Sequence, residues 1–245
     1  MKSKRASETS KKSLKNNPRL VSKDPLRNAR VFLLPWLVDI LWAMPISSTK
    51  YESIRSSEYS PHSSWALWQL TEPHEKPKAR MGDMSVFEES SELLNALHTD
   101  IVFVALNAAD RDIQPEPFSA FHDTSHTAMD YKMRYAFRDT ILWGSYITDF
   151  FHGLRETDSG KVKRYLFENP EYLAASVARF KAELAFVADD GKKPILIALG
   201  SQVKELLDLY VSHDYTIFSL PHYSYSVMTK ELYREKALEL ITQLP

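Results

Sequence analysis

Continuous hydrophobic runs mark the second half of the chain. Three of them are 100–107 (DIVFVALN), 194–199 (PILIAL) and 215–220 (YTIFSL). Short apolar runs that do not alternate with polar residues are typical of strands covered on both faces. A fourth segment, LWGSYITDFF, is rich in aromatic and β-branched residues, and we place the core of a strand at 146–150. The pattern therefore predicts four buried strands.

Apolar residues at helical spacing lie between and after these runs. The three stripes are Leu173, Val177, Phe180, Leu184 and Val187; Val203, Leu206, Leu207 and Tyr210; and Tyr233, Ala237, Leu240, Ile241 and Leu244. Such stripes predict amphipathic helices that pack on a sheet. The alternation of strands and helices predicts an α/β fold, a three-layer α/β/α sandwich around a short, mostly parallel sheet of four strands.

The first hundred residues lack this regularity. The first fifteen contain six lysines and arginines, one glutamate and little that is apolar, a composition that favours disorder. The apolar segment 31–44 is too short to cross a membrane and is interrupted by proline and aspartate, whereas 47–64 and 72–80 have the composition of loops. We divide the chain into a disordered basic tail (1–30), a partly helical extension with loops (31–98) and an α/β domain (99–245).

Composition narrows the possible functions. The 245 residues include 31 Lys+Arg, 32 Asp+Glu and no Cys, with a formal net charge of -1. Disulfides and iron–sulfur clusters are excluded, and any binding of a polyanion must be local. The N-terminal basic residues are not followed by the apolar run of a secretory signal, so we expect a cytoplasmic protein.

In open parallel sheets, ligands bind beyond the carboxyl ends of the strands. Here those ends carry Asn107, Thr148–Asp149, Gly200–Ser201 and the sequence PHYS at 221–224. No GxGxxG follows the first strand, and neither GxxxxGK[ST] nor GxSxG occurs in the chain. A dinucleotide fold, a P-loop and a hydrolase elbow are therefore not predicted.

The four strand ends, VALNAAD, YITDF, LIALGS and PHYSYS, resemble in order the motifs of the uracil-DNA glycosylase superfamily. The resemblance covers residues 100–245. It implies hydrolysis of the N-glycosidic bond of a flipped uracil, or of another damaged or mismatched base, in base excision repair. We then expect DNA as the partner, no metal or organic cofactor, no membrane association and a monomer.

The resemblance also assigns roles to residues. Asn107 would position the attacking water, and His222 would donate to the oxygen of the departing base, stabilising its negative charge. A flipped base needs an aromatic wall, for which Phe118 and Phe121 are the candidates and Phe121 the preferred one. Thr148 and Asp149 would bind the base edge.

Contacts with DNA phosphates would come from hydroxyl and backbone N–H groups near two of the strand ends. The residues assigned to them are Ser201, Ser224, Tyr225 and Ser226. An ionised Asp149 would only accept hydrogen bonds, so it would prefer an exocyclic amine to a carbonyl. If Asp149 points into the pocket, we hypothesise that uracil is not the preferred base. The chain departs from the family pattern in three places, since Tyr223 stands where proline is usual, Ala108–Ala109 replace a Pro-Gly turn, and Thr148–Asp149 stand where uracil-specific members have Asn.

Other interpretations of these residues stay open. Asn107 could close a turn, His222 could bond a backbone carbonyl, both phenylalanines could belong to the core, and Asp149 could cap the next segment. The protein could be a nucleobase- or nucleic-acid-binding module without catalysis, or a scaffold for a partner. His122, Asp123, His126 and Asp130 could bind a metal if they shared a helical face. Arg155, Lys161, Lys163 and Arg164 form either a phosphate-binding patch or a solvated loop.

Overall fold

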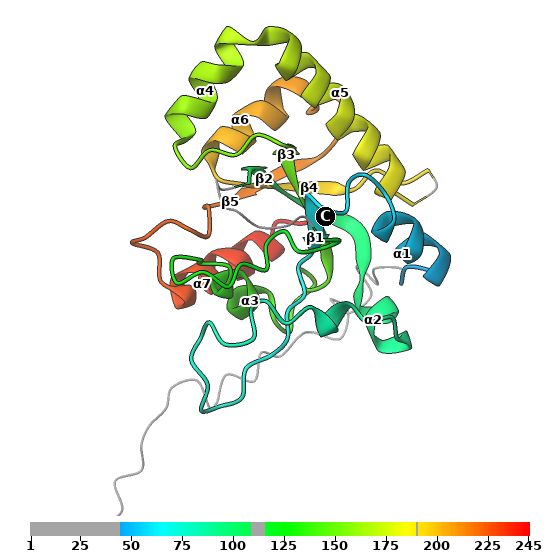
Figure 1. Ribbon diagram of the computed structural model, residues 1–245, viewed down its shortest axis with the longest axis vertical. Helices are drawn as coiled ribbons and strands as arrows, with labels where there is room; N and C mark the ends of the chain where they lie inside the picture. The colour runs from blue at the N-terminus through cyan, green and yellow to red at the C-terminus, as the bar shows by residue number, and fades with distance from the viewer. Residues whose placement is uncertain (1–44, 109–115, 190) are drawn as a thin grey trace, which may run out of the picture. The chain divides into compact units, whose positions relative to one another are not determined.

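The computed structural model describes residues 45–108, 116–189 and 191–245, all of which belong to one compact unit (Figure 1). The basic tail and the apolar segment 31–44 lie outside the described residues. The helices are α1 (Ser48–Arg55), the 3-10 helix η2 (Met84–Phe87), α2 (Ser91–Ala96), α3 (Tyr131–Phe137), α4 (Ser159–Glu168), α5 (Pro170–Val187), α6 (Ser201–Tyr210) and α7 (Lys230–Ile241). The strands are β1 (Ser63–Trp65), β2 (His98–Asn107), β3 (Ser145–Phe151), β4 (Ile195–Leu199) and β5 (Ile217–Leu220).

The strands form one sheet in the order β1-β3-β2-β4-β5. Strands β3, β2, β4 and β5 are parallel, and they correspond to the four predicted runs. The α/β class is therefore confirmed. The expected number of four strands is wrong, because β1 adds a fifth, antiparallel to β3, with Ser63 opposite Thr148.

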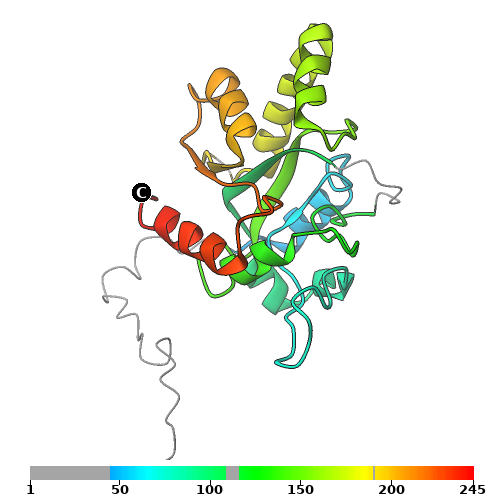
Figure 2. The same ribbon diagram turned by 90° about the vertical axis from the view of Figure 1, so that its left-hand side faces the viewer.

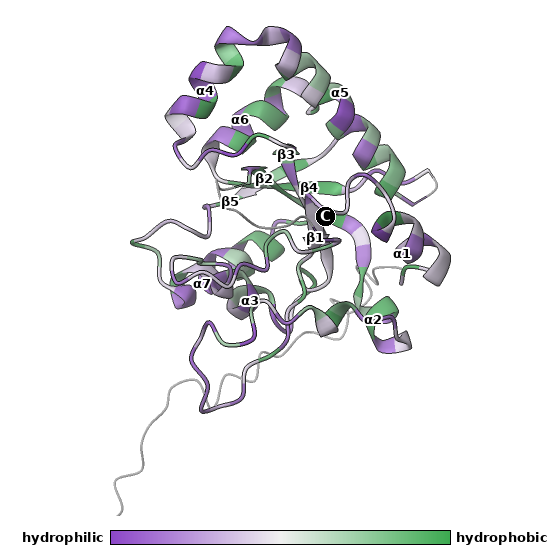
Figure 3. Ribbon diagram, in the orientation of Figure 1, coloured by the Kyte–Doolittle hydropathy of each residue, from purple (hydrophilic) through white to green (hydrophobic). Residues whose placement is uncertain are grey.

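Helices cover both faces of the sheet (Figures 1 and 2). Along β2, Val102 and Val104 point into a core shared with α4, α5 and α6, whereas Ile101, Phe103 and Ala105 point into a core shared with α3 and α7. Successive strand residues face opposite sides, so a strand buried on both faces needs apolar residues throughout. In Figure 3, α5 and α6 alternate hydrophilic and hydrophobic segments, in agreement with the predicted stripes.

The segment 47–64 is not the loop that its composition predicts. It contains α1, whose N-terminus is capped by the Ser47 side chain accepting from the Lys50 amide, and whose Tyr51 and Ile54 are buried. It also contains the first two residues of β1. Both serines of β1 are buried with their hydroxyl groups hydrogen-bonded. The Ser63 hydroxyl donates to the Tyr59 carbonyl, and the Ser64 hydroxyl donates to the Phe118 carbonyl.

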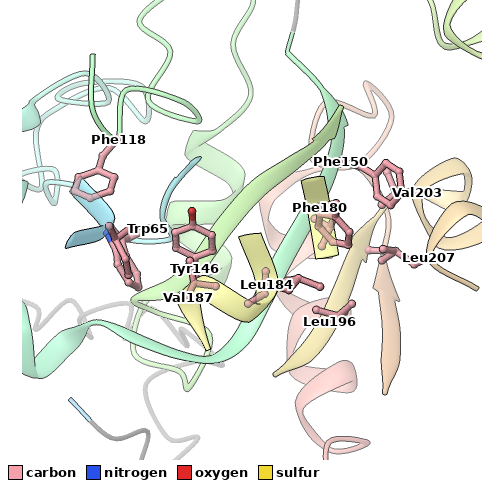
Figure 4. Close-up of a cluster of buried hydrophobic side chains, with 14 of the residues drawn as sticks. Trp65, Phe118, Tyr146, Phe150, Phe180, Leu184, Val187, Leu196, Val203 and Leu207 are labelled. Atoms are coloured by element: carbon pink, nitrogen blue, oxygen red, sulfur yellow. The ribbon is translucent and has the colours of Figure 1, made fainter. Parts of the chain in front are cut away.

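Residues before 98 also supply large side chains to the cores of the described unit. Trp65 lies against Tyr146 of β3 with ring centroids 5.2 Å apart (Figure 4), and Trp68 belongs to the core on the opposite face. The segment 72–80 contains neither helix nor strand, as its charge and prolines predict. Among the helices that the structure describes, none is both long and apolar enough to span a membrane.

Gly144, which precedes β3, gives a test of this packing. Its φ is +83°, and an added Cβ would lie 1.8 Å from the Ala96 carbonyl oxygen. Gly191 has a similar φ of +74°, but no atom lies within 4 Å of a Cβ added there. We expect Gly191→Ala to lower the free energy of unfolding by about 1–2 kcal/mol and Gly144→Ala by on the order of 3–4 kcal/mol or more, because strain and overlap combine.

Urea unfolding of the two variants measures this difference. Equal losses would show that the contact between Gly144 and Ala96 does not constrain the start of β3.

Candidate functional site

The site lies where the connections that leave β2 and β4 diverge. The two strands are neighbours, but the chain runs from β2 to α3 on one face and from β4 to α6 on the other. Such a point opens a crevice beyond the carboxyl ends of the strands. A cleft of about 820 Å³ lies there, lined on its two sides by Ala105–Ala108 and Leu199–Val203.

The cleft brings together most of the residues that the sequence assigns to a site. Those that line it are Asn107, Phe121, Asp149, Ser201, His222, Ser224 and Tyr225. They come from all four predicted strand ends and from the segment before α3. Phe118, Thr148 and Ser226 do not line it. Ser226 is exposed on the loop between β5 and α7, coloured orange in Figure 2.

Phe118 and Thr148 belong to the protein interior, so the expected contact of both with a base is corrected. The Phe118 ring is 1% exposed and packs on Tyr51, Trp65 and Phe87 (Figure 4). Thr148 is fully buried because its position in β3 faces the helical layer opposite to that faced by its neighbour Asp149.

The segment 118–121 has an unusual backbone that positions Phe121. Both phenylalanines have positive φ, 63° and 64°, which costs about 1–2 kcal/mol per residue. Hydrogen bonds hold the conformation: the Phe118 amide donates to the Ser60 carbonyl at 2.9 Å, and the Trp68 indole donates to the Phe121 carbonyl at 3.0 Å. Phe118 is thus an anchor in the core, and Phe121 forms part of the cleft wall.

Asn107 ends β2 and ties the cleft to the loop after β3. Its side-chain Nδ2 donates to the carbonyls of Ala108 (2.9 Å), Leu154 (3.2 Å) and Glu156 (2.8 Å). These three acceptors fix the orientation of the amide. The carbonyl oxygen Oδ1 has no donor among the described residues and can therefore accept from a ligand or a water.

His222 follows β5 and has a defined tautomer. The Ser224 amide donates to its Nδ1 at 3.2 Å, so Nδ1 carries no proton and the neutral ring has its N–H at Nε2. Burial lowers the pKa of His222 to about 4, which keeps the ring neutral at physiological pH. The ring stacks on Tyr223 with centroids 4.4 Å apart. His222 is thus a held, uncharged hydrogen-bond donor.

Asp149 is also uncharged at neutral pH. It is 4% exposed, and burial, with a smaller contribution from the nearby Glu183 carboxyl, raises its pKa to about 8. The expectation of an ionised Asp149 that only accepts is therefore corrected. A protonated carboxyl has one donor and one acceptor, the same pair that an amide offers.

The alternative metal site is not formed in the part of the chain that the structure describes, where no group of three or more suitable side chains converges. The segment from 122 to 129 is not helical. His122 is buried, and its Nε2 lies 2.9 Å from the Ser64 hydroxyl. Because that hydroxyl donates to the Phe118 carbonyl, it accepts from His122, which fixes the imidazole as a structural donor.

The basic residues after β3 separate into two groups. Arg155 is exposed and lines the cleft. Lys161, Lys163 and Arg164 lie on α4 outside the cleft lining, and the Lys161 ammonium is 3.6 Å from the Glu156 carboxylate. Of these four basic residues, only Arg155 lines the cleft.

Sequence patterns did not indicate the cleft residue His62, nor the buried pair of His152 and Glu183 against which it lies. His62 precedes a strand of three residues, which is too short to show alternation. Glu183 occupies one position of an otherwise amphipathic helix, and its burial depends on the tertiary fold.

Comparison of the sequence with protein-family models gives no match, and comparison with curated proteins gives none either.

The protonation of Asp149 predicts how stability depends on pH. The folded protein retains the proton up to about pH 8, whereas the unfolded chain loses it near the ordinary value of 3.8. Stability therefore falls as pH rises through this window, by up to about 1.4 kcal/mol per pH unit from this group. Asp149→Asn removes the titration, so its stability relative to the unsubstituted protein should rise between pH 5 and pH 8.

Urea unfolding at pH 5, 6.5 and 8 measures the difference, with the exposed Asp208→Asn as the matched control. A difference that stays constant with pH for Asp149→Asn contradicts the protonated state.

Proposed function

We propose that the protein is a DNA glycosylase-like hydrolase that cleaves the N-glycosidic bond of a flipped uracil or another damaged or mismatched base. The observation that carries the proposal is the convergence of Asn107, Asp149 and His222 on one cleft, with Phe121 in its wall. Their order along the chain is that of the motifs in the resemblance. No cofactor enters the proposed chemistry.

The chemistry assigns complementary tasks to two of these residues. Cleavage leaves negative charge on the base and positive charge on the sugar. The Nε2–H of His222 would donate to the base oxygen as that charge develops, and a preorganised donor is effective at this task. The Oδ1 of Asn107 would accept from the attacking water and orient its lone pair toward the sugar.

The base edge would be bound by the protonated Asp149. Its O–H donates to a carbonyl oxygen, and its C=O accepts from a ring N–H. Bases with adjacent carbonyl and N–H groups, such as uracil, hypoxanthine and xanthine, fit this pair. Phe121 would stack on the flipped base, and stacking offsets part of the few kcal/mol that flipping costs.

The DNA itself would be held at the rim of the cleft. Ser201, Ser224 and Tyr225 supply polar groups near the mouth, Arg155 supplies a positive charge, and Tyr225 is 57% exposed. Contacts of this kind position a nucleic acid without selecting its sequence. Because the formal net charge of the chain is -1, binding would rely on this local group of side chains.

Oligonucleotides that carry uracil, hypoxanthine, xanthine or a mismatched base test the proposal. We expect abasic sites in at least one of them. Asn107→Ala and His222→Ala should each lower the rate by about 10²–10³, the typical effect of losing one such group. The exposed His213→Ala is the control and should retain full activity.

The same assay, together with a DNA-binding measurement, distinguishes the proposed hydrolase from a binding module without catalysis. If every oligonucleotide stays intact while salt-dependent binding of DNA persists, the cleft belongs to a binding module without catalysis.

Activity should also depend on pH through Asp149. Above its pKa of about 8 the carboxylate loses its donor and places a negative charge beside the departing base. We expect kcat/KM to fall as pH rises through about 8, since this parameter reports the free enzyme. Asp149→Asn keeps a donor and an acceptor without titrating, so it should remove this alkaline limb. An unchanged alkaline limb in the variant would assign it to another group.

A further inference from the structure

His62 and Asp149 both line the cleft, although His62 comes from the segment before the motif-bearing part of the chain. Strand β1 pairs with β3 in antiparallel register, with Ser63 opposite Thr148 and Ser64 opposite Ile147. Continued by one residue beyond the start of β1, this register would place residue 62 opposite residue 149. Both side chains line the cleft.

The His62 ring rests on a rigid buried layer. It stacks on the ring of His152, with centroids 4.6 Å apart and planes 27° apart. The Nε2 of His152 is 3.3 Å from the Thr148 hydroxyl and 3.1 Å from a carboxylate oxygen of Glu183. The other oxygen of that fully buried carboxylate accepts from the Tyr146 hydroxyl at 3.0 Å. The position of His62 is therefore set by side chains outside the cleft.

The polar atoms of His62 are available to a ligand. The residue is half-buried, its ring nitrogens have no hydrogen-bond partner among the described residues, and neither nitrogen is sealed from solvent. Burial first, and then the neighbouring His152 and Arg179, lower the pKa of His62 to about 4. The neutral ring offers one donor and one acceptor.

We propose that His62 is a specificity-determining residue, which binds a second polar group of the base next to the carbonyl and N–H pair bound by Asp149. The inference rests on the proposed function, since it takes a base as the ligand. The inference predicts a preference for bases with a further carbonyl on the edge that Asp149 binds. Xanthine and hypoxanthine test this preference well, because they differ by one carbonyl group at that edge.

The experiment compares His62→Ala, His62→Phe and the exposed His74→Ala. The phenylalanine keeps the stack on His152 but has no polar atom, so it separates hydrogen bonding from packing. We expect both His62 variants to lower the ratio of kcat/KM for xanthine to that for hypoxanthine by about tenfold, the value of one good hydrogen bond. His74→Ala should leave the ratio unchanged, and thermal melting should show that His62→Phe is folded.

Titration with the free bases provides a second measurement that does not require cleavage. The unsubstituted protein should bind xanthine more tightly than hypoxanthine, and His62→Phe should lose that difference. If Asn107→Ala abolishes cleavage while His62→Phe keeps the ratio, the inference on His62 is overturned and the proposed function stands. If the protein neither cleaves any oligonucleotide nor binds any free base, the inference on His62 and the proposed function are both overturned.

Discussion

Strand β2 lies between two parallel neighbours and between two layers of helices. From Ile101 to Ala105 no residue is more than 3% exposed, and all the backbone polar groups of a strand in this position need partners within the sheet. This part of the strand carries no polar side chain, and the first polar side chain after it is Asn107, at the carboxyl end. The chain there leaves toward one layer, and the chain after β4 leaves toward the other. The cleft forms between the two exits.

Uncharged titratable groups give this cleft its chemical character. Burial lowers the pKa of His62 and His222 and raises that of Asp149, so all three are neutral near pH 7. Each change reflects the cost of holding a charge away from water. Neutral donors and acceptors suit an uncharged ligand edge, such as that of a nucleobase, better than they suit a phosphate. The cleft lining also contains charged side chains, among them Arg155 and Glu156.

The sequence predicts those features that depend on long, regular patterns. The apolar and aromatic segments predicted β2 to β5, of which β2, β3 and β4 are largely buried, whereas the edge strand β5 is buried only at Leu220. The strand ends predicted that Asn107, Asp149 and His222 would line one cleft. The short β1 could not be predicted, since two of its three residues are serines whose hydroxyls find backbone partners only in the folded chain. The sequence also could not predict that Phe118 lies in the core and Phe121 in the cleft wall.

Asn107 shows how the fold and the proposed chemistry are linked. Its amide nitrogen holds the carbonyls of Leu154 and Glu156, and these contacts fix where its oxygen lies. The residue thus joins the end of β2 to the loop after β3, the strand that carries Asp149. The hydrogen bonds between Asn107 and this loop would then position both the attacking water and the base. In the proposed reaction, a change at Asn107 would alter both positions, whereas a change at His222, whose partner Ser224 lies on the same loop, would act mainly on the departing base.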